Sequence, residues 1–514
     1  MGRAVQGLVL VAMAVGLCVG PSHAAPGVWV APSLVRVSPQ AQPGTATRLT
    51  VRAAKGETES FQILVRAPAG GLTNVRVAGS FTGGVPITLY REHYVYVSKT
   101  RLNWPGSTNR AEGPGWYPDA LIPAVDPATG KALQGELRAM PVDVAGGQNV
   151  GFWVDVTVPR DQRAGDYQGT FTVSTDQGKA TVAADLHVWN FVLPLRPYLK
   201  SCFLYWPTDS HGAGRGQTQP DEELLRHRLM PISINSANEA RFIGDFGLNS
   251  VSAGFWSGAD NTTGKMLAAP SAHEFSAARA KHAMDLFVYN YTADEIGPNP
   301  ALHAPMREWA RNMHHADIHN LVTMAPLPEL SDDGEGRSAV DVWVVLPKMY
   351  DESRDAILAA LKRGDEVWSY NAVVQDNYSP KWQLDFAPID YRIQTGFINQ
   401  SLGLTGLLYW RVDDWSKEPW KDVMAYPGYP GEGMLVYPGA PVGVTGVVPS
   451  MRLKYLRDGV DDYDYVQLLR AKGQGDWALD VVRTVGRDWH DWTQDPEALE
   501  AARVKLGERL SGGK

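Results

Sequence analysis

The strongest constraint on the fold is a change of hydrophobic pattern at Pro194-Leu195-Arg196-Pro197. Before it, from about Trp29 to Val192, short alternating stretches are divided by Gly, Pro and Asp. After it, apolar runs are separated by stretches with helical periodicity. Proline fixes φ and removes a backbone donor, so a closely spaced pair of prolines indicates a linker. The chain therefore predicts two different architectures joined near residue 197.

The first part reads as short, regularly spaced strands. They cover residues 60–65, 94–97, 152–156, 169–173 and 184–189. Alternating strands with turn signals between them are typical of a β-sandwich. We expect an all-β sandwich domain over residues 26–197.

The second part contains eight apolar runs. They are residues 201–206, 231–235, 250–255, 286–292, 321–326, 342–347, 366–371 and 407–412. Helical stretches lie between most of them, at 222–229, 274–284, 306–314, 353–362 and 389–402. Eight such β/α units predict a TIM-type (β/α)8 barrel over residues 198–425. Because the second run is short and 329–338 resembles a loop, a doubly wound open sheet is the alternative. We expect residues 426–514, a Gly/Pro/Tyr-rich segment followed by charged helices, to form a C-terminal helical extension packed on the barrel.

The first 25 residues have the order of a secretory signal peptide. Arg3 precedes an apolar run at 7–20, and Ser22-His23-Ala24 follows it. We therefore expect a secreted or periplasmic protein. The apolar run is shorter than the roughly 20 residues that cross a bilayer, and no later stretch lacks charge for that length, so no membrane span is expected. After cleavage Cys202 is the only cysteine, which leaves no internal disulfide.

Composition limits the classes of ligand that the protein is expected to bind. The formal net charge of −8 argues against a nucleic-acid partner. The 17 Trp and 20 Tyr residues supply flat rings that can stack on sugars, although buried rings are commonly core.

The adjacent carboxyl residues Asp294 and Glu295 follow the fourth run, where barrel enzymes place catalytic groups. Neighbouring strand residues face opposite sides, so both can enter one pocket only if the strand ends there, and Gly297-Pro298 supplies that ending. Two close carboxyls repel when both are ionised, which favours keeping one proton, and Glu295 is the expected general acid. The alternative is a solvated pair that caps the next helix.

Consecutive residues cannot readily straddle a sugar ring as an ordinary carboxylate pair does. We therefore expect the substrate's own 2-acetamido oxygen to attack the anomeric carbon. Asp294 would hold the acetamido N–H and stabilise the oxazolinium ion.

Motifs along most of the chain are similar to those of glycoside hydrolase family 123, whose members include β-N-acetylgalactosaminidases. In the first part they are Glu57-Thr58-Glu59-Ser60-Phe61-Gln62, Gly115-Trp116-Tyr117-Pro118-Asp119 and Gly165-Asp166-Tyr167-Gln168-Gly169. In the second they are Gly406-Leu407-Leu408-Tyr409-Trp410, Gly431-Glu432-Gly433-Met434-Leu435-Val436-Tyr437-Pro438-Gly439, Pro449-Ser450-Met451-Arg452-Leu453 and Leu456-Arg457-Asp458-Gly459-Val460-Asp461-Asp462-Tyr463-Asp464-Tyr465.

The resemblance implies a β-sandwich followed by a (β/α)8 barrel, and an adjacent Asp-Glu pair acting with substrate assistance, here Asp294 and Glu295. Two positions depart from the pattern. Ile296 stands where Pro is usual, and Ser369 where a second aromatic residue is usual. Both bear on sugar preference more than on chemistry.

Aromatic residues near the ends of the runs are candidate sugar contacts. They are Trp256, Trp343, Trp368, Tyr370, Tyr409 and Trp410. Trp410 is the candidate floor of the cleavage subsite, and Tyr370 the candidate donor to the acetamido carbonyl. Each can equally be a core residue. Asp413 and Asp414 are rival carboxyls, because a nucleophile there would make the enzyme a conventional retaining glycosidase.

We expect no metal and no cofactor. His314, His315 and His319 have metal-like spacing, but no Glu-bearing metal motif accompanies them. The acidic cluster from Asp458 to Asp464 leaves calcium open, although its spacing fails the loop template and helix capping explains Asp458 more simply.

The predicted function is thus an exported retaining glycoside hydrolase of β-N-acetylhexosaminidase type, β-N-acetylgalactosaminidase-like, that acts on a glycan through an oxazoline intermediate. A conventional two-carboxylate glycosidase on a non-acetamido sugar is one alternative. A catalytically silent carbohydrate-binding envelope protein is the other. The sequence leaves open the sugar and linkage, exo or endo cleavage, the natural glycan and the oligomeric state.

Overall fold

The computed structural model describes residue 1 and residues 25–101, 103–206 and 218–512. The predicted signal peptide, residues 1–25, falls almost wholly outside these residues. In the described part of the chain, no helix has the length and apolar character that crossing a membrane requires.

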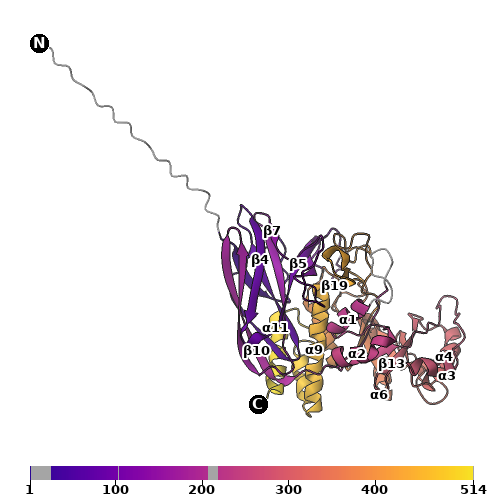
Figure 1. The fold of residues 1–514 in the computed structure, drawn as a ribbon. Helices are drawn as coiled ribbons and strands as arrows, with labels where there is room; N and C mark the ends of the chain where they lie inside the picture. Colours follow the sequence, from indigo (N-terminus) through magenta and orange to yellow (C-terminus); the bar gives the residue numbers. More distant parts are fainter. Residues whose placement is uncertain (2–24, 102, 207–217, 513–514) are drawn as a thin grey trace.

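The N-terminal part consists of two five-stranded sheets (Figure 1). The first has the order β1-β3-β8-β5-β6, with bounds Gly27–Pro32, Thr58–Arg66, Asn149–Thr157, Ile87–Val97 and Gly115–Pro123. The second has the order β2-β10-β9-β4-β7, with bounds Arg48–Lys55, Gly178–Val192, Gly165–Thr175, Leu72–Phe81 and Val142–Val144. All pairs are antiparallel except β2 with β10.

The two sheets share one apolar core. Phe61 on β3 and Phe171 on β9 are fully buried, and their rings meet edge to face with centroids 5.3 Å apart. Ile63 and Val65 continue the same face of β3 into this core, as the period-2 pattern predicts. Both faces of β3 are buried. On the other face, Leu64 packs against Trp29 and Ser60 accepts a hydrogen bond from Arg457 of the C-terminal part at 2.9 Å.

The C-terminal part is built on seven parallel strands in the order β11-β17-β16-β15-β14-β13-β12. Their bounds are Lys200–Phe203, Gly406–Tyr409, Glu366–Tyr370, Val342–Val345, His319–Thr323, Phe287–Asp294 and Ser250–Ser252. Between the two outer strands, the amide of Ile232 donates to Phe203 at 3.0 Å and that of Ser252 donates to Ile232 at 2.9 Å. Seven of the eight predicted runs are strands, and the second is a single bridge between Phe203 and Pro231. The result is a near-closed parallel barrel.

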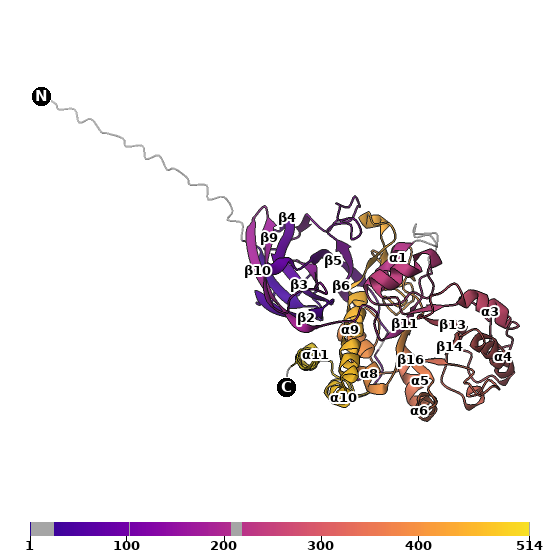
Figure 2. The same cartoon turned by 60° about the horizontal axis from the view of Figure 1, so that its bottom comes forward.

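Helices cover the outside of the barrel (Figure 2). The main ones are α1 (Thr218–Arg226), α3 (Ala272–Arg279), α4 (His303–His314), α5 (Pro347–Glu352) and α6 (Arg354–Arg363). The predicted helix at 389–402 is present as α7 (Ile389–Ile393), a π-helical turn (Gln394–Ile398) and α8 (Asn399–Leu402). After β14 only a short 3-10 turn, Pro328–Leu330, precedes the loop, as predicted for this connection.

Strand alternation divides the barrel side chains into two sets. Inside lies a cluster made of Cys202, Tyr289, Tyr291, Leu321, Val342, Val344, Leu346, Trp368, Tyr370 and Leu408. The alternate positions, among them Trp343 and Tyr409, face the helices and belong to the large outer core. This division decides which strand residues can reach a ligand at the barrel mouth.

Helix α9 (Met451–Ala471) joins the two parts and is followed by α10 (Gly475–Arg483) and α11 (Pro496–Leu510). In Figure 2, α9 runs between the sandwich and the barrel. Lys454 on α9 pairs with Asp155 of the sandwich at 2.7 Å. Arg392 on α7 reaches Glu59 on β3 at 3.0 Å and Asp462 on α9 at 2.7 Å. Two of the sequence motifs, 57–62 and 456–465, thus meet in one buried ion-pair network.

The acidic cluster of α9 is neutralised by arginines. Arg228 pairs with Asp461 at 2.7 Å and with Asp464 at 2.5 Å. Asp458 pairs with Arg457 at 2.7 Å, in the middle of the helix. The capping explanation for Asp458 is therefore wrong, because Ser450 is the N-cap of α9. These contacts indicate a structural role for the cluster.

Arg452 forms a second buried junction. Its guanidinium donates to both oxygens of Asp119 on β6, at 2.8 and 2.7 Å, and to the carbonyl of Gly431 at 2.7 Å. The Tyr437 hydroxyl donates to the same carboxylate at 2.6 Å. Because all these groups are excluded from water, removing one partner would leave a buried charge uncompensated.

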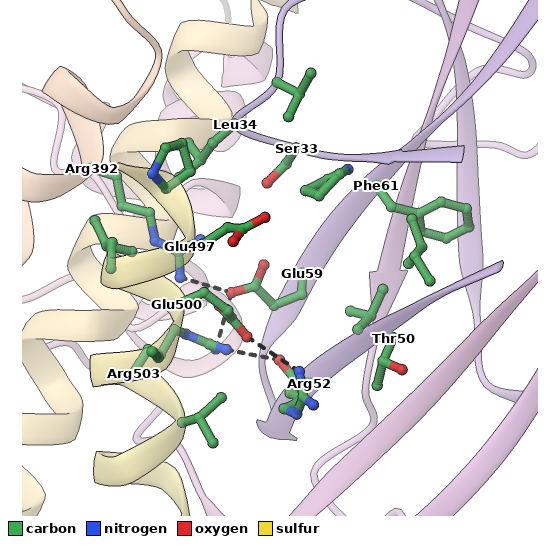
Figure 3. A pocket seen from close by; sticks show the side chains of 18 of the residues that line it. Ser33, Leu34, Thr50, Arg52, Glu59, Phe61, Arg392, Glu497, Glu500 and Arg503 are labelled. Atoms are coloured by element: carbon green, nitrogen blue, oxygen red, sulfur yellow. Dashed lines mark hydrogen bonds and ion pairs between the residues drawn. The ribbon is translucent and has the colours of Figure 1, made fainter. Parts of the chain in front are cut away.

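A cavity of about 760 Å3 lies between the sandwich and α11 (Figure 3). Apolar side chains such as Phe61 and Leu499 line it beside the ion pair of Glu59 and Arg503. None of the predicted site residues lines this cavity, so it is separate from the site described next.

Candidate active site

The end of β13 places Asp294 and Glu295 at the barrel mouth. The register against β14 shifts between Tyr291 and Ala293, so β13 carries an extra residue there. Glu295 then adopts φ +43, a left-handed conformation that costs a non-glycine residue about 1–2 kcal/mol. Its amide donates to the carbonyl of Thr323 at 3.0 Å and to the hydroxyl of Thr323 at 2.9 Å. The strand therefore ends at the pair, and both carboxylates are exposed.

Two hydroxyls hold Asp294. Tyr291 donates to Oδ1 at 2.8 Å and Thr323 donates to the same oxygen at 2.5 Å. No donor of the described residues is recorded for Oδ2. One oxygen is thus fixed in place by the protein, and the other is available to accept a hydrogen bond from a ligand.

Tyr370, at the end of β16, holds Glu295. Its hydroxyl donates to Oε1 at 2.8 Å. Burial and the Glu295 charge raise the pKa of Tyr370 well above its ordinary value, so the phenol keeps its proton and remains a donor. The sequence predicts that Tyr370 donates a hydrogen bond to the acetamido carbonyl. In the structure its hydroxyl instead donates its single proton in a hydrogen bond to Glu295.

Trp410 lies directly after β17, the strand next to β16, and is partly exposed. Its indole N–H donates to Glu432 Oε1 at 2.7 Å. Glu432 is buried, and its other oxygen accepts from the amide of Val373 at 2.9 Å and from Gln383 at 3.2 Å. Burial raises the pKa of Glu432 to about 7. The adjacent Gly433 touches the Trp410 ring so closely that a Cβ would lie 2.5 Å away.

The remaining predicted aromatic residues separate into two groups. Trp256 is 52% exposed, and its ring meets that of Tyr291 edge to face at 5.9 Å, beside Asp294. Trp368 is buried inside the barrel, with its N–H donated to Glu366 at the opposite end of β16. Trp343 and Tyr409 are fully buried against the helices. These last three do not reach the barrel mouth, so the structure corrects their assignment as sugar contacts.

The rival carboxyls lie beyond Trp410 and pair with Arg411. Asp413 is 1% exposed and accepts from the amide of Trp206 at 3.0 Å and from Arg411 at 3.2 Å. Asp414 is partly exposed and accepts from Arg411 at 3.0 Å. Burial raises the pKa of both carboxyls. Burial of Asp413 removes it from contact with a sugar, which leaves Asp414 as the accessible rival.

Comparison with known proteins identifies the domain to which most of the barrel belongs. Residues 275–469 match the family model described as "Glycoside hydrolase 123, catalytic domain". This match includes the exposed pair Asp294 and Glu295. It also includes Trp410 and Glu432.

The chain carries a family 123 glycoside hydrolase domain.

A solved family 123 glycoside hydrolase from Clostridium perfringens, described in connection with glycolipid glycan hydrolysis, shares the fold. It is 12% identical with a TM-score of 0.64, and the alignment covers 95% of this chain and 98% of that one. Two β-glucuronidases align far less well, each with a TM-score of 0.27. The Parabacteroides merdae enzyme is 9% identical over 69% of this chain and 45% of its own, and the Bacteroides uniformis enzyme is 11% identical over 80% and 50%. Their scores are too low to support an argument. No curated protein sequence matches significantly.

Three residues of the candidate site are not among those that the sequence indicated. Tyr291 and Thr323 fix Asp294, and Glu432 fixes Trp410. Position gave a signal for two of them, because Tyr291 precedes Asp294 on the same strand and Thr323 ends the next strand. Glu432 belongs to the motif that runs from Gly431 to Gly439, but nothing in that motif indicates a contact with Trp410, which lies 22 residues away.

The three histidines with metal-like spacing make ordinary protein contacts. His314 lies between Asp333 at 2.7 Å and Asp341 at 3.0 Å. His315 binds Glu335 at 3.1 Å, and His319 stacks on Phe287 with centroids 4.2 Å apart. Among the described residues, no group of three or more His, Cys, Asp or Glu side chains is placed to hold a metal ion.

Proposed function

We propose that this glycoside hydrolase is a retaining enzyme of β-N-acetylhexosaminidase type, β-N-acetylgalactosaminidase-like, that works with substrate assistance. The observation that carries the proposal is the sharp turn at Glu295, which brings two adjacent carboxylates to one mouth with separate hydrogen-bond donors. Separate donors allow separate roles, since each environment fixes a different carboxylate orientation.

In the first step the Glu295 carboxyl protonates the glycosidic oxygen as the bond from that oxygen to the anomeric carbon breaks. The carbonyl oxygen of the substrate's 2-acetamido group forms a new bond to the anomeric carbon and closes an oxazolinium ring. Asp294 accepts a hydrogen bond from the acetamido N–H through Oδ2 and stabilises the positive charge.

In the second step Glu295, now ionised, takes a proton from water. The water oxygen attacks the anomeric carbon, and the ring opens to restore the acetamido group. Two inversions at one carbon give net retention. Tyr370 contributes by holding Oε1 of Glu295, which leaves Oε2 to face the leaving-group oxygen.

The conventional two-carboxylate mechanism has one remaining candidate in Asp414. A nucleophile for that mechanism must lie about 5–5.5 Å from the acid, across the sugar. Asp414 accepts from Arg411 and is turned toward that guanidinium. The match to a catalytic domain disfavours the silent carbohydrate-binding alternative.

Further parts of the proposal rest on the sequence. The order of residues 1–25 supports export, with a secreted or periplasmic location. The Phe203–Pro231 bridge supports a (β/α)8 barrel whose second strand is shortened to one pair. The change of pattern at residue 197 supports the domain boundaries 26–197, 198–425 and 426–514.

Substrate assistance is tested by comparing 4-nitrophenyl 2-acetamido-2-deoxy-β-galactoside with the matching 2-hydroxy galactoside. Because the 2-hydroxy sugar lacks the internal nucleophile, we expect kcat/KM to fall by at least about a thousandfold. Equal turnover of the two substrates would refute substrate assistance and favour Asp414 as the nucleophile of a conventional mechanism. Replacing Asp294 with Ala should slow the acetamido substrate and leave turnover of any 2-hydroxy substrate nearly unchanged.

A further inference from the structure

A row of aromatic rings leads away from Trp410 along the loop after the barrel. The Trp410 and Tyr426 rings meet edge to face with centroids 6.3 Å apart. Tyr426 and Tyr429 meet in the same way at 6.0 Å. Tyr426 is 47% exposed, so this ring has a free face for a ligand.

The row continues onto the sandwich. The Arg101 guanidinium lies over the Tyr429 ring at 5.2 Å and over the Trp104 ring at 5.6 Å, and it donates to the Tyr429 hydroxyl. Both Arg101 and Trp104 belong to the segment between β5 and β6. Together with Val374, in the loop that follows β16, they line a small cavity. The sandwich thus contributes side chains next to the barrel mouth.

Backbone contacts fix this sandwich segment on the barrel. The amide of Thr108 donates to the carbonyl of Asn377 at 2.9 Å, and that of Glu112 donates to the carbonyl of Asp385 at 2.8 Å. The Asn109 side chain donates to the buried carboxylate of Asp390 at 2.5 Å. These hydrogen bonds hold the position of the segment relative to the strand ends, as a ligand-binding wall requires.

Beyond Tyr426 lies a surface hollow of about 410 Å3, lined by Tyr96, Lys99, Met424 and Pro427. Tyr96 is 48% exposed and packs with Trp116, which is 44% exposed, at a centroid distance of 5.2 Å. A cluster of half-exposed rings of this kind adds little to a core and is typical of a binding surface. With a net charge of −8 on the chain, a nucleic acid is a poor fit.

We propose that Tyr426, Tyr429, Arg101 and Trp104, with the hollow beside Tyr96, form accessory subsites for an oligosaccharide. They bind the sugar residues that follow the cleaved one. The inference rests on the proposed function and on the sequence-based expectation that Trp410 is the floor of the cleavage subsite. Aromatic faces stack on the C–H faces of successive sugars, and a row of rings starting at the cleavage subsite suits a chain of sugars better than a single one.

The test uses isothermal titration calorimetry on the full chain carrying Glu295→Gln, which prevents cleavage. The probes are a tetrasaccharide with a non-reducing β-linked N-acetylgalactosamine and the methyl glycoside of that single sugar. We expect Tyr426→Ala to raise the Kd of the tetrasaccharide about fivefold relative to that of the monosaccharide, the effect of one stacked ring. Tyr426→Phe keeps the ring and should restore most of the affinity.

Tyr198→Ala is the matched control. Tyr198 is 46% exposed, as Tyr426 is, but it precedes β11 at the opposite end of the barrel strands. Its replacement should change neither Kd. An unchanged ratio of the two Kd values in Tyr426→Ala would overturn the inference.

Failure of the proposed function gives a different result. If the sugar assignment is wrong, the parent protein binds neither probe. A glycan array of the parent protein then identifies the oligosaccharide that it retains, and the Tyr426 comparison is repeated with that ligand. If the array retains no oligosaccharide, both the inference and the proposed function are overturned.

Discussion

Replacing Glu92 with Gln should stabilise the protein, and the gain should grow as the pH rises. Glu92 lies on β5, is 0% exposed, and neither carboxylate oxygen has a hydrogen-bond partner among the described residues. Burial raises the pKa of Glu92 from 4.5 to about 8. In the folded protein the carboxyl therefore stays neutral across a range in which the unfolded chain releases the proton.

The size of the effect follows from this difference. One pKa unit corresponds to ~1.4 kcal/mol, so Glu92 lowers the free energy of unfolding by ~5 kcal/mol between pH 4.5 and pH 8. This ~5 kcal/mol of the free energy of unfolding is fully present below pH 4.5, and it is lost as the pH rises toward 8. The amide of the Glu92→Gln variant cannot ionise, so the variant lacks this loss.

The assay is urea unfolding followed by tryptophan fluorescence at pH 5.5, 6.5 and 7.5. The free energy of unfolding of Glu92→Gln minus that of the wild type should increase by ~1.4 kcal/mol per pH unit. Glu136→Gln, at an exposed position of the same sandwich, controls for the loss of one negative charge. A difference that stays constant with pH would refute a buried, unpaired carboxyl at Glu92.

Two further predictions concern the domain junction and the site. Arg452→Ala leaves the carboxylate of Asp119 buried without its partner, so the free energy of unfolding should fall by about 3–5 kcal/mol, measured as a lower melting temperature. A change of under ~1 kcal/mol would contradict a structural role for this pair. Tyr370→Phe removes the donor to Glu295 and should lower kcat on the aryl acetamido substrate by about 10- to 100-fold, with little change in melting temperature. A kcat equal to that of the wild type would show that this hydrogen bond does not contribute to catalysis.

The sequence predicted the location of the carboxyl pair but not its supports. An apolar run followed by Asp294-Glu295-Ile296-Gly297 predicts that the strand ends in a turn, and the structure has that turn at Glu295. Glu432 was not predictable in the same way, because its contact with Trp410 depends on the fold of the loop after the barrel.

The aromatic candidates show a second limit. Residues 342–345 are apolar at every position, so nothing in the run tells which side chains face the helices. The pattern therefore predicts Trp343 at the site, although its side chain faces outward and its N–H donates to Asp365 at 3.1 Å. Tyr409 fails for the same reason, since it alternates with Leu408 inside the barrel. The hydrophobic pattern predicts where a uniformly apolar strand lies in the sequence, but it does not show which side chains face the barrel interior and which face the helices.

The acidic run in α9 shows the third limit. Asp458, Asp461 and Asp464 pair with Arg457 and Arg228. Arg228 lies more than two hundred residues away in the sequence. Only the folded arrangement distinguishes such a buried ion-pair network from a helix cap or an ion site.

The measurement closest to the central claim is a crystal structure of the protein soaked with N-acetylgalactosamine-thiazoline, a stable mimic of the oxazoline intermediate. We predict that Asp294 Oδ2 lies at hydrogen-bond distance, about 2.7–3.2 Å, from the thiazoline nitrogen. Glu295 should lie beside the anomeric carbon, where the leaving group departs. A bound thiazoline that contacts neither carboxylate, or an Asp414 carboxylate aligned with the anomeric carbon instead, would contradict substrate assistance by this pair.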